Sequence, residues 1–164
     1  MQKMGLTVRP ASPVDVPSLV GLRLANAEAH VALEPDVYRV PRRDAVRRHF
    51  TAMLADESRP DTVLVAEAQD GRVVGMVEVL PQPEPPEHQI LNPEPSAQVH
   101  TVVLPDVRGL GVGAALLRAA ERWATDRGIS YLSAGIYHRN VDAVRFYGRH
   151  GFTAAGTSLG RRLG

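Results

Sequence analysis

The sequence predicts an α+β fold in which helices pack on a sheet, and three observations carry this prediction. Short apolar runs alternate with segments of helical periodicity along the 164 residues. The apolar runs 62–68 and 73–80 are separated only by Gln69-Asp70-Gly71, a turn typical of an antiparallel hairpin. The hydrophobic share of 44% and the charged share of 23% are those of a globular protein. This length suits one domain, so we expect a single domain over 1–164.

The first half of the chain predicts a strand, two helices and then the first strand of the hairpin. A strand is expected over 6–11, and Ser12-Pro13 is a typical start for a helix that runs to about Ala29. A second helix is expected over 44–55, where apolar residues recur at helical spacing. The second strand is the hairpin run 62–68.

A segment rich in proline and glutamate interrupts the pattern at 81–96. Six prolines lie between Pro81 and Pro95, together with Glu84, Glu87 and Glu94. Proline at this density is incompatible with a regular interior element, so a long loop is expected. We refer to it as the arm. Its composition is compatible with a lid over an acceptor pocket, an exposed insertion or a dimer contact.

The second half predicts a strand, a helix, a strand, a helix and a last short strand. A helix over 111–127 is followed by Gly128, where a left-handed residue ends a helix. A strand is expected over 131–137, and a helix capped by Asn140 ends before Gly151. The final strand is expected over 152–156.

Composition narrows the classes of function. The chain has no cysteine, which excludes disulfides and thiol nucleophiles. No apolar run approaches a membrane span, so a cytoplasmic protein is expected. The net charge of +1 gives no general argument for nucleic acid. The arginine cluster between Arg42 and Arg48 is compatible with phosphate contacts, although such a run is more often a solvated helix face.

The stretch Gln98–Gly113, QVHTVVLPDVRGLGVG, carries the clearest functional signal. It predicts a strand, a tight turn and a glycine-rich start of a helix. The first N–H groups of a helix lack partners within it and favour an anion. Glycines at 109, 111 and 113 let phosphate oxygens approach the main chain, although close helix packing also explains them. The spacing fits neither a P-loop nor a dinucleotide-binding fingerprint.

Two motifs together resemble the GNAT superfamily of N-acetyltransferases. Arg108–Gly113, RGLGVG, matches the family pattern Q/R-x-x-G-x-G/A, and Asn140–Phe152 matches N-x-x-A-x-x-F-Y-x-x-x-G-F. The resemblance implies an α/β/α sandwich around a mixed, mostly antiparallel sheet of six to seven strands, flanked by four helices. It also implies a splay between the fourth and fifth strands, so a gap is expected between Thr101 and Leu132.

The resemblance implies acetyl-CoA as the cosubstrate, and no metal is expected. The main chain of Arg108, Gly109, Leu110, Gly111, Val112 and Gly113 would hold the pyrophosphate. The strand residues Thr101 and Val103 would pair with the pantetheine arm as an added strand does, and Asn140 would hydrogen-bond it, in addition to capping its helix. The Val103 N–H would also stabilise the carbonyl oxygen as negative charge develops.

The resemblance also implies a catalytic tyrosine. Tyr147 would be the general acid that protonates the departing thiolate; packing in the core is the alternative for this side chain. A phenol with a pKa near 10 stays protonated at neutral pH, so this chemistry is feasible. The base that deprotonates the amine is open between His100 and Glu78, with His138 third, because the family defines no single base position.

The function expected from this reading is direct attack of a primary amine on acetyl-CoA through a tetrahedral intermediate. A small-molecule acceptor, such as a polyamine, an amino acid or an aminoglycoside-like antibiotic, ranks ahead of a protein or peptide. The alternatives are a non-catalytic acyl-CoA sensor and, on the arginine cluster alone, a nucleic-acid contact module. No nucleic-acid or membrane partner is expected, whereas a homodimer is a further expectation.

Overall fold

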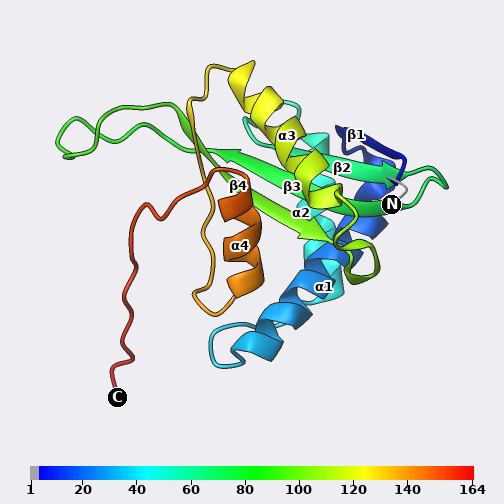
Figure 1. The fold of residues 1–164 in the computed structure, drawn as a ribbon, viewed down its shortest axis with the longest axis horizontal. Coiled ribbons are helices and arrows are strands. Elements are labelled where there is room, and N and C mark those ends of the chain that lie inside the picture. Colours follow the sequence, from blue (N-terminus) through cyan, green and yellow to red (C-terminus); the bar gives the residue numbers. More distant parts are fainter. Residues whose placement is uncertain (1–3) are drawn as a thin grey trace.

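The structure of this protein is a computed structural model that describes residues 4–164 (Figure 1). Its strands and helices follow one another along the chain, with two short 3-10 turns among them. In chain order the elements are β1 (Leu6–Pro10), η1 (Pro13–Asp15), α1 (Val16–Leu33), α2 (Arg43–Ala55), β2 (Thr62–Ala68), β3 (Val73–Pro81), β4 (Ser96–Val103), η2 (Pro105–Val107), α3 (Val112–Thr125), β5 (Tyr131–Ser133) and α4 (Val141–Arg149).

The strands form one mixed sheet in the order β1-β2-β3-β4-β5. The first four strands pair with antiparallel neighbours, and only β5 runs parallel to its neighbour β4. The β2–β3 turn is the predicted hairpin: Gly71 has a φ of 85°, and its N–H donates to the carbonyl of Ala68. The register of β3 on β4 places Val77 opposite Thr101 and Glu78 opposite His100.

Helices cover both faces of this sheet, so the fold has three layers (Figure 1). One core cluster lies between the sheet and α3, with the α4 residue Tyr147 in it. The other cluster lies between the sheet and the pair α1 and α2, around the fully buried Phe50. Side chains of β4 alternate between the two clusters, because successive residues of a strand face opposite sides. Val99 and Val103 therefore pack toward α3, whereas Val102 packs toward α1.

Local sequence signals explain where the helices begin and end. Pro13 opens the first turn, and the Ser12 N–H donates to the Asp15 carboxylate at 2.8 Å. Gly128 and Gly151 follow α3 and α4 with φ values of 74° and 86°, which is the left-handed termination that the sequence predicts. Helix α1 continues to Leu33, one turn beyond the expected end, because no residue before Pro35 stops it.

The prediction of six to seven strands is wrong, because the sheet in the described residues has five. The expected strand over 152–156 does not form; the chain after Gly151 is extended, without regular structure (Figure 1). The expected strand over 131–137 shortens to Tyr131–Ser133. Because β5 is so short, it offers little edge on which a further strand could pair.

The arm leaves the sheet as an irregular loop between the ends of β3 and β4 (Figure 1). Its base is tied down, since the Gln82 N–H donates to the Ser96 carbonyl at 2.8 Å. Two large apolar side chains at its tip, Ile90 and Leu91, are exposed. The arm therefore starts from the end of β4 opposite to Val103.

Candidate active site

A cavity of about 810 Å³ lies between the second half of α1, the end of β4, the start of α3 and α4. Residues from all four elements line it, together with the turn that joins β4 to α3. They are Asn26, Ala29, His30, Leu33, Thr101, Val102, Val103, Val107, Arg108, Gly109, Gly111, Val112, Gly113, Ala114, Asn140, Asp142, Ala143, Arg145, Phe146, Tyr147, Arg149 and His150. None of these residues belongs to the arm. A lid role for the arm thus gains no support from this arrangement.

The cavity lies where β4 and β5 stop pairing and separate. Their pairing covers only Ser96 to Gln98 on β4 and Tyr131 to Ser133 on β5. Beyond Gln98, β4 continues to Val103 without a partner on that side within residues 4–164. The Leu104 N–H donates to Val74 on β3, and successive N–H groups of a strand point to opposite edges, so the Val103 N–H faces the gap. This is the separation expected between Thr101 and Leu132.

The turn before α3 presents main-chain donors to this cavity. Gly109 and Gly111 have φ values of 78° and 87°, which other residues adopt only with strain. The first N–H bonded into the helix is that of Ala115, which donates to the Gly111 carbonyl at 3.1 Å. The N–H groups from Gly109 to Ala114 precede that bond and remain available to an anion. The Arg108 N–H is the exception, since it faces the Pro105 carbonyl at 3.5 Å.

Gly113 has a different reason to be glycine. A Cβ atom added there would lie 2.9 Å from Cε2 of Phe146 on α4, which is closer than van der Waals contact allows. The residue therefore lets α3 and α4 approach each other. Of the two explanations that the sequence left open for this glycine, the structure shows close packing, here between two helices.

Tyr147 lines the cavity and is only 7% exposed. Its hydroxyl donates to Thr101 Oγ1 at 3.0 Å, which joins α4 to β4 beside the gap. Phe146 and Phe152 pack edge-on against its ring at 5.0 and 5.1 Å between ring centroids. Burial raises the pKa of the Tyr147 phenol above its ordinary value of 10.0, although hydrogen bonding with Thr101 opposes this shift. The hydroxyl therefore keeps its proton at neutral pH.

Asn140 caps α4 from the rim of the same cavity. Its side-chain oxygen accepts the Ala143 N–H at 3.2 Å, so the capping role expected from the sequence is present. The side-chain amide group remains a donor that the cap does not use. Capping and ligand binding are therefore compatible at this residue.

The two proposed bases lie together but outside the cavity lining. Glu78 and His100 are register partners on β3 and β4, on the face that packs toward α1 and α2. Glu78 is buried and accepts a hydrogen bond from Arg23 Nη2 at 2.5 Å, whereas His100 is exposed. His138 packs edge-on against Tyr137 at 4.7 Å and is also not among the lining residues. An amine in the cavity would therefore reach these bases only through intervening groups or water.

The residues that α1 contributes to the cavity were not predicted from the sequence. Asn26 and His30 line the cavity from α1, whereas Tyr147 lines it from α4. No motif marks them, because they lie in an ordinary apolar helix. The i to i+4 spacing of Asn26 and His30 was the only available signal, since such residues share one face of a helix. Arg145 and Arg149 of α4 also line the cavity without having been predicted, and so does His150 after the end of α4, which the sequence placed only on the inward side of that helix.

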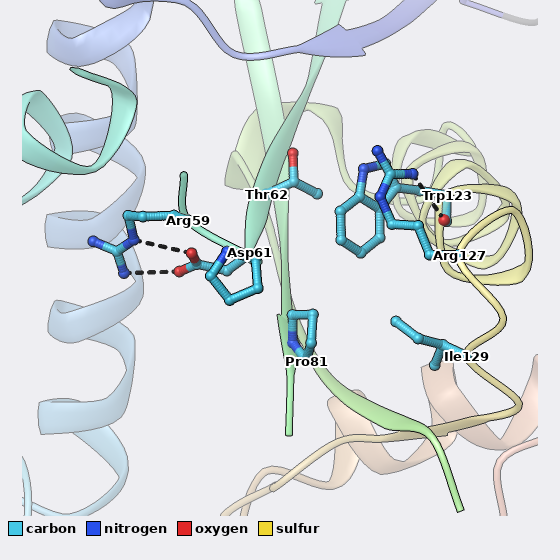
Figure 2. Close-up of a pocket in the computed structure, with 8 residues that line it drawn as sticks. Arg59, Asp61, Thr62, Pro81, Trp123, Arg127 and Ile129 are labelled. Carbon is cyan, nitrogen blue, oxygen red and sulfur yellow. Dashed lines mark hydrogen bonds and ion pairs between the residues drawn. The ribbon is translucent and has the colours of Figure 1, made fainter. Parts of the chain in front are cut away.

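A second depression, of about 510 Å³, lies at the other end of β4, and its lining residues make structural contacts with one another (Figure 2). Its charged side chains are already engaged in contacts. Arg59 bonds to both oxygens of Asp61 at 2.9 and 2.8 Å. Arg127 lies 3.9 Å from the centroid of the Trp123 ring and donates to the carbonyl of the same residue. With its charges satisfied in this way, this depression offers no acid–base pair for catalysis.

The arginine cluster on α2 has the features of a solvated helix face. Arg42, the N-cap of the helix, and Arg48 both bond to Asp44 in the first turn, at 3.1 and 2.8 Å. Within the described residues, no helix is long and apolar enough to cross a membrane. Residues 4–164 also contain no group of three or more His, Asp or Glu side chains arranged to hold a metal ion.

Comparison with known proteins identifies the family. Residues 27–152 match the acetyltransferase (GNAT) family. The chain is 31% identical to an aminoglycoside N(6')-acetyltransferase type 1 of Stenotrophomonas maltophilia over 150 residues, which are 89% of this chain and 85% of that protein. It is 33% identical to a protein of the same name from Klebsiella aerogenes over 96 residues, 58% of this chain and 62% of the relative.

Solved structures agree with the fold. A variant of the BH1408 protein from Bacillus halodurans superposes with a TM-score of 0.82 at 21% identity, over 96% of this chain and 99% of that one. Aminoglycoside N-acetyltransferase AAC(6')-Iy in complex with CoA superposes with a TM-score of 0.72 at 19% identity, over 99% and 97% of the two chains. Fold and matches together define an acetyltransferase. The chain belongs to the acetyltransferase (GNAT) family, and it is an acetyl-CoA-dependent N-acetyltransferase.

The residues around the cavity suit this cosubstrate. Coenzyme A carries phosphates, and the glycine turn presents N–H groups in the positive field of a helix start. Arg108, Arg145 and Arg149 add positive charge to the lining, against one carboxylate, that of Asp142. The unpaired edge of β4 provides main-chain groups with which amides of a ligand could pair, as an added strand does. When bound, acetyl-CoA supplies the thioester that is the acetyl donor.

Proposed function

We propose that this protein acetylates a primary amine on a small cationic molecule of the amino-sugar class. The single observation that carries the proposal is the hydrogen bond between Tyr147 and Thr101 at 3.0 Å, in a cavity that the glycine turn also lines. A proton donor and an anion site in one cavity suit acyl transfer from a phosphate-bearing thioester. The acceptor class is taken from the two curated relatives, which are named as aminoglycoside acetyltransferases.

In this proposal the main chain from Gly109 to Gly113 holds the pyrophosphate, and the Asn140 amide group binds the pantetheine. The Val103 N–H stabilises the carbonyl oxygen as charge develops on it. The neutral amine nitrogen bonds to the carbonyl carbon and loses a proton to water, the carbon–sulfur bond breaks, and Tyr147 gives its proton to the departing sulfur. A phenol whose pKa is raised by burial holds that proton until a thiolate forms. A cytoplasmic location and a homodimer stay predictions from the sequence.

The test is a turnover assay with a panel of amines. The purified protein is incubated with acetyl-CoA and, in separate reactions, an aminoglycoside, a linear polyamine, a free amino acid and a peptide, while thiol release and product mass are measured. We expect the aminoglycoside to be the best acceptor. Preference for the peptide would replace the acceptor class, and tight binding of CoA without turnover on any amine would favour a sensor.

A further inference from the structure

His30, in the last turn of α1, lines the cavity, has the chemistry of a base and was assigned no role from the sequence. Three lining residues carry side chains that accept protons, namely His30, Asp142 and His150. A carboxylate is a weak base at neutral pH, whereas an imidazole titrates near it. Asp142 is therefore the poorest of the three.

The two histidines differ in the wall they occupy. His150 caps the C-terminal end of α4, three residues beyond Tyr147, and packs against Phe146 at 4.9 Å. It shares the wall of the proton donor. His30 lies on the α1 wall, so an acceptor amine between the two walls would have the acid on one side and an imidazole on the other. This placement suits a reaction in which one proton leaves the nucleophile and another reaches the leaving group.

Local contacts fix the ring of His30. Its Nδ1 atom lies 2.8 Å from the carbonyl oxygen of Asn26, one turn earlier in the helix. A carbonyl only accepts, so Nδ1 carries the hydrogen and Nε2 of the neutral ring keeps a free lone pair. Tyr38 packs edge-on against the ring at 4.9 Å and is itself packed by Tyr137 at 5.4 Å. A fixed tautomer with a lone pair on the outer nitrogen is the form that accepts a proton.

The charged groups near His30 come from three segments. Glu34 lies one turn further along the chain, accepts a hydrogen bond from the Tyr137 hydroxyl at 3.3 Å and faces Arg139 at 3.7 Å. Across the cavity, α4 contributes Asp142, Arg145 and Arg149. Glu34 therefore lies in an ion pair, which leaves His30 as the proton acceptor that α1 brings to the cavity.

We propose that His30 is the general base of the reaction, taking the proton of the acceptor amine on Nε2, directly or through one water. This inference rests on the proposed function. The protonated amine first gives one proton to His30, which releases it to solvent, so that the nitrogen gains a free lone pair. The neutral nitrogen then bonds to the carbonyl carbon and loses a second proton to water, the carbon–sulfur bond breaks, and the proton of Tyr147 passes to sulfur; Tyr147 regains a proton from solvent. The sum is one amide, one thiol and one released proton from one ammonium and one thioester.

The test compares His30→Gln with the wild type and with His88→Gln, a control in the exposed arm. kcat/KM is measured across pH with two acceptors: an alkylamine that is protonated at neutral pH, and an amine whose conjugate acid has a pKa well below 7. We expect His30→Gln to lose about 10²-fold or more with the alkylamine and its acidic limb to flatten. The loss with the weakly basic amine should be far smaller, and CoA affinity by calorimetry should match the wild type.

Several results would overturn the inference. These are an unchanged pH profile in His30→Gln, equal losses with both amines, or a flattened limb in His100→Gln or His150→Gln instead. Should His30→Gln fail to fold, His30→Phe keeps an aromatic ring against Tyr38 and serves in its place. A wild type that acetylates neither amine would refute the proposed function itself, whereas an active wild type with an unaffected His30 variant refutes only the base.

Discussion

The hydroxyl of Tyr147 donates to Thr101 Oγ1 at 3.0 Å and thereby ties α4 to β4 where the sheet opens. Tyr147, the predicted general acid on α4, is thus hydrogen-bonded to β4, the strand that is predicted to bind the coenzyme. Replacing Tyr147 with Phe removes the proton donor while keeping the ring that packs on Phe146 and Phe152. We expect kcat to fall about 10²- to 10⁴-fold, with CoA affinity nearly unchanged by calorimetry.

The pH dependence of that residue has a definite sign. Because burial raises the pKa of Tyr147 above 10.0, the wild type should show no basic limb from this group below pH 10. Thr101→Val is the matched variant: it leaves the phenol without its acceptor and should cost about 1–3 kcal/mol of unfolding free energy. Activity of Tyr147→Phe equal to that of the wild type would remove the acid assignment.

Alanine variants of Gly111 and Gly128 separate a loss of phosphate binding by the turn before α3, the phosphate seat, from a general loss of stability through backbone strain. Both have a positive φ, 87° and 74°, and open space where a Cβ would go. Alanine at either position should cost about 1–2 kcal/mol in stability. Only Gly111→Ala should also weaken CoA binding, because only Gly111 lies in the turn that lines the cavity. Equal CoA affinity in the two variants would contradict the assignment of the seat.

Gly113 tests the packing of α3 on α4. Its substitution by alanine places a methyl group against Phe146, so the unfolding free energy should fall by about 1–3 kcal/mol. Shortening the neighbour in the double variant Gly113→Ala/Phe146→Leu should recover part of that loss. Chemical denaturation of the single and double variants measures the coupling, and additive losses would show that the two residues do not interact.

Glu78 is expected to act through stability rather than chemistry. It is buried and bonded to Arg23, whose guanidinium also lies 5.3 Å from the centroid of the Phe50 ring. Glu78→Gln should cost about 1–3 kcal/mol of unfolding free energy, with the acidic limb of kcat/KM intact. A flattened limb in a variant of normal stability would restore Glu78 as the base.

Asp15 predicts how stability responds to acid. Hydrogen bonds from Arg9 lower the pKa of this carboxyl below its ordinary value, although burial opposes the shift. A carboxyl with a lowered folded-state pKa stabilises the protein above its unfolded pKa near 4, and the contribution is lost as pH falls through the folded value. Melting temperatures of wild type and Asp15→Asn should therefore converge as the pH falls below about 4.

Local signals in the sequence predicted most of the fold. The hairpin at Gly71 and the helix ends at Gly128 and Gly151 depend on short-range conformational preference, and all three were correct. The strand expected after Gly151 was wrong for a non-local reason. Phe152 packs on the Tyr147 ring, but a strand also needs a paired edge, and β5 ends at Ser133.

The residues of the candidate site also fall into those that local sequence predicts and those that depend on tertiary contacts. The glycine turn and Tyr147 lie in motifs with fixed spacing, which a single sequence can display. His30 depends on Asn26 within its helix and on Tyr38 and the α4 wall beyond it. Of these contacts, only the one with Asn26 follows a regular sequence spacing, that of residues i and i+4 in a helix. A base that is defined by tertiary neighbours leaves no pattern to read in the chain.

Helix α3 contributes both to the cavity and to the core. Its first turn borders the cavity, while Leu116, Leu117 and Ala120 are buried in the core. Fraying of this helix would dismantle the phosphate seat and the centre of the molecule in one event. A saturating coenzyme should therefore protect α3 amides against hydrogen exchange and raise the melting temperature, by an amount that grows with the logarithm of its concentration. The supply of coenzyme in the cell would then set the lifetime of the folded enzyme as well as its rate.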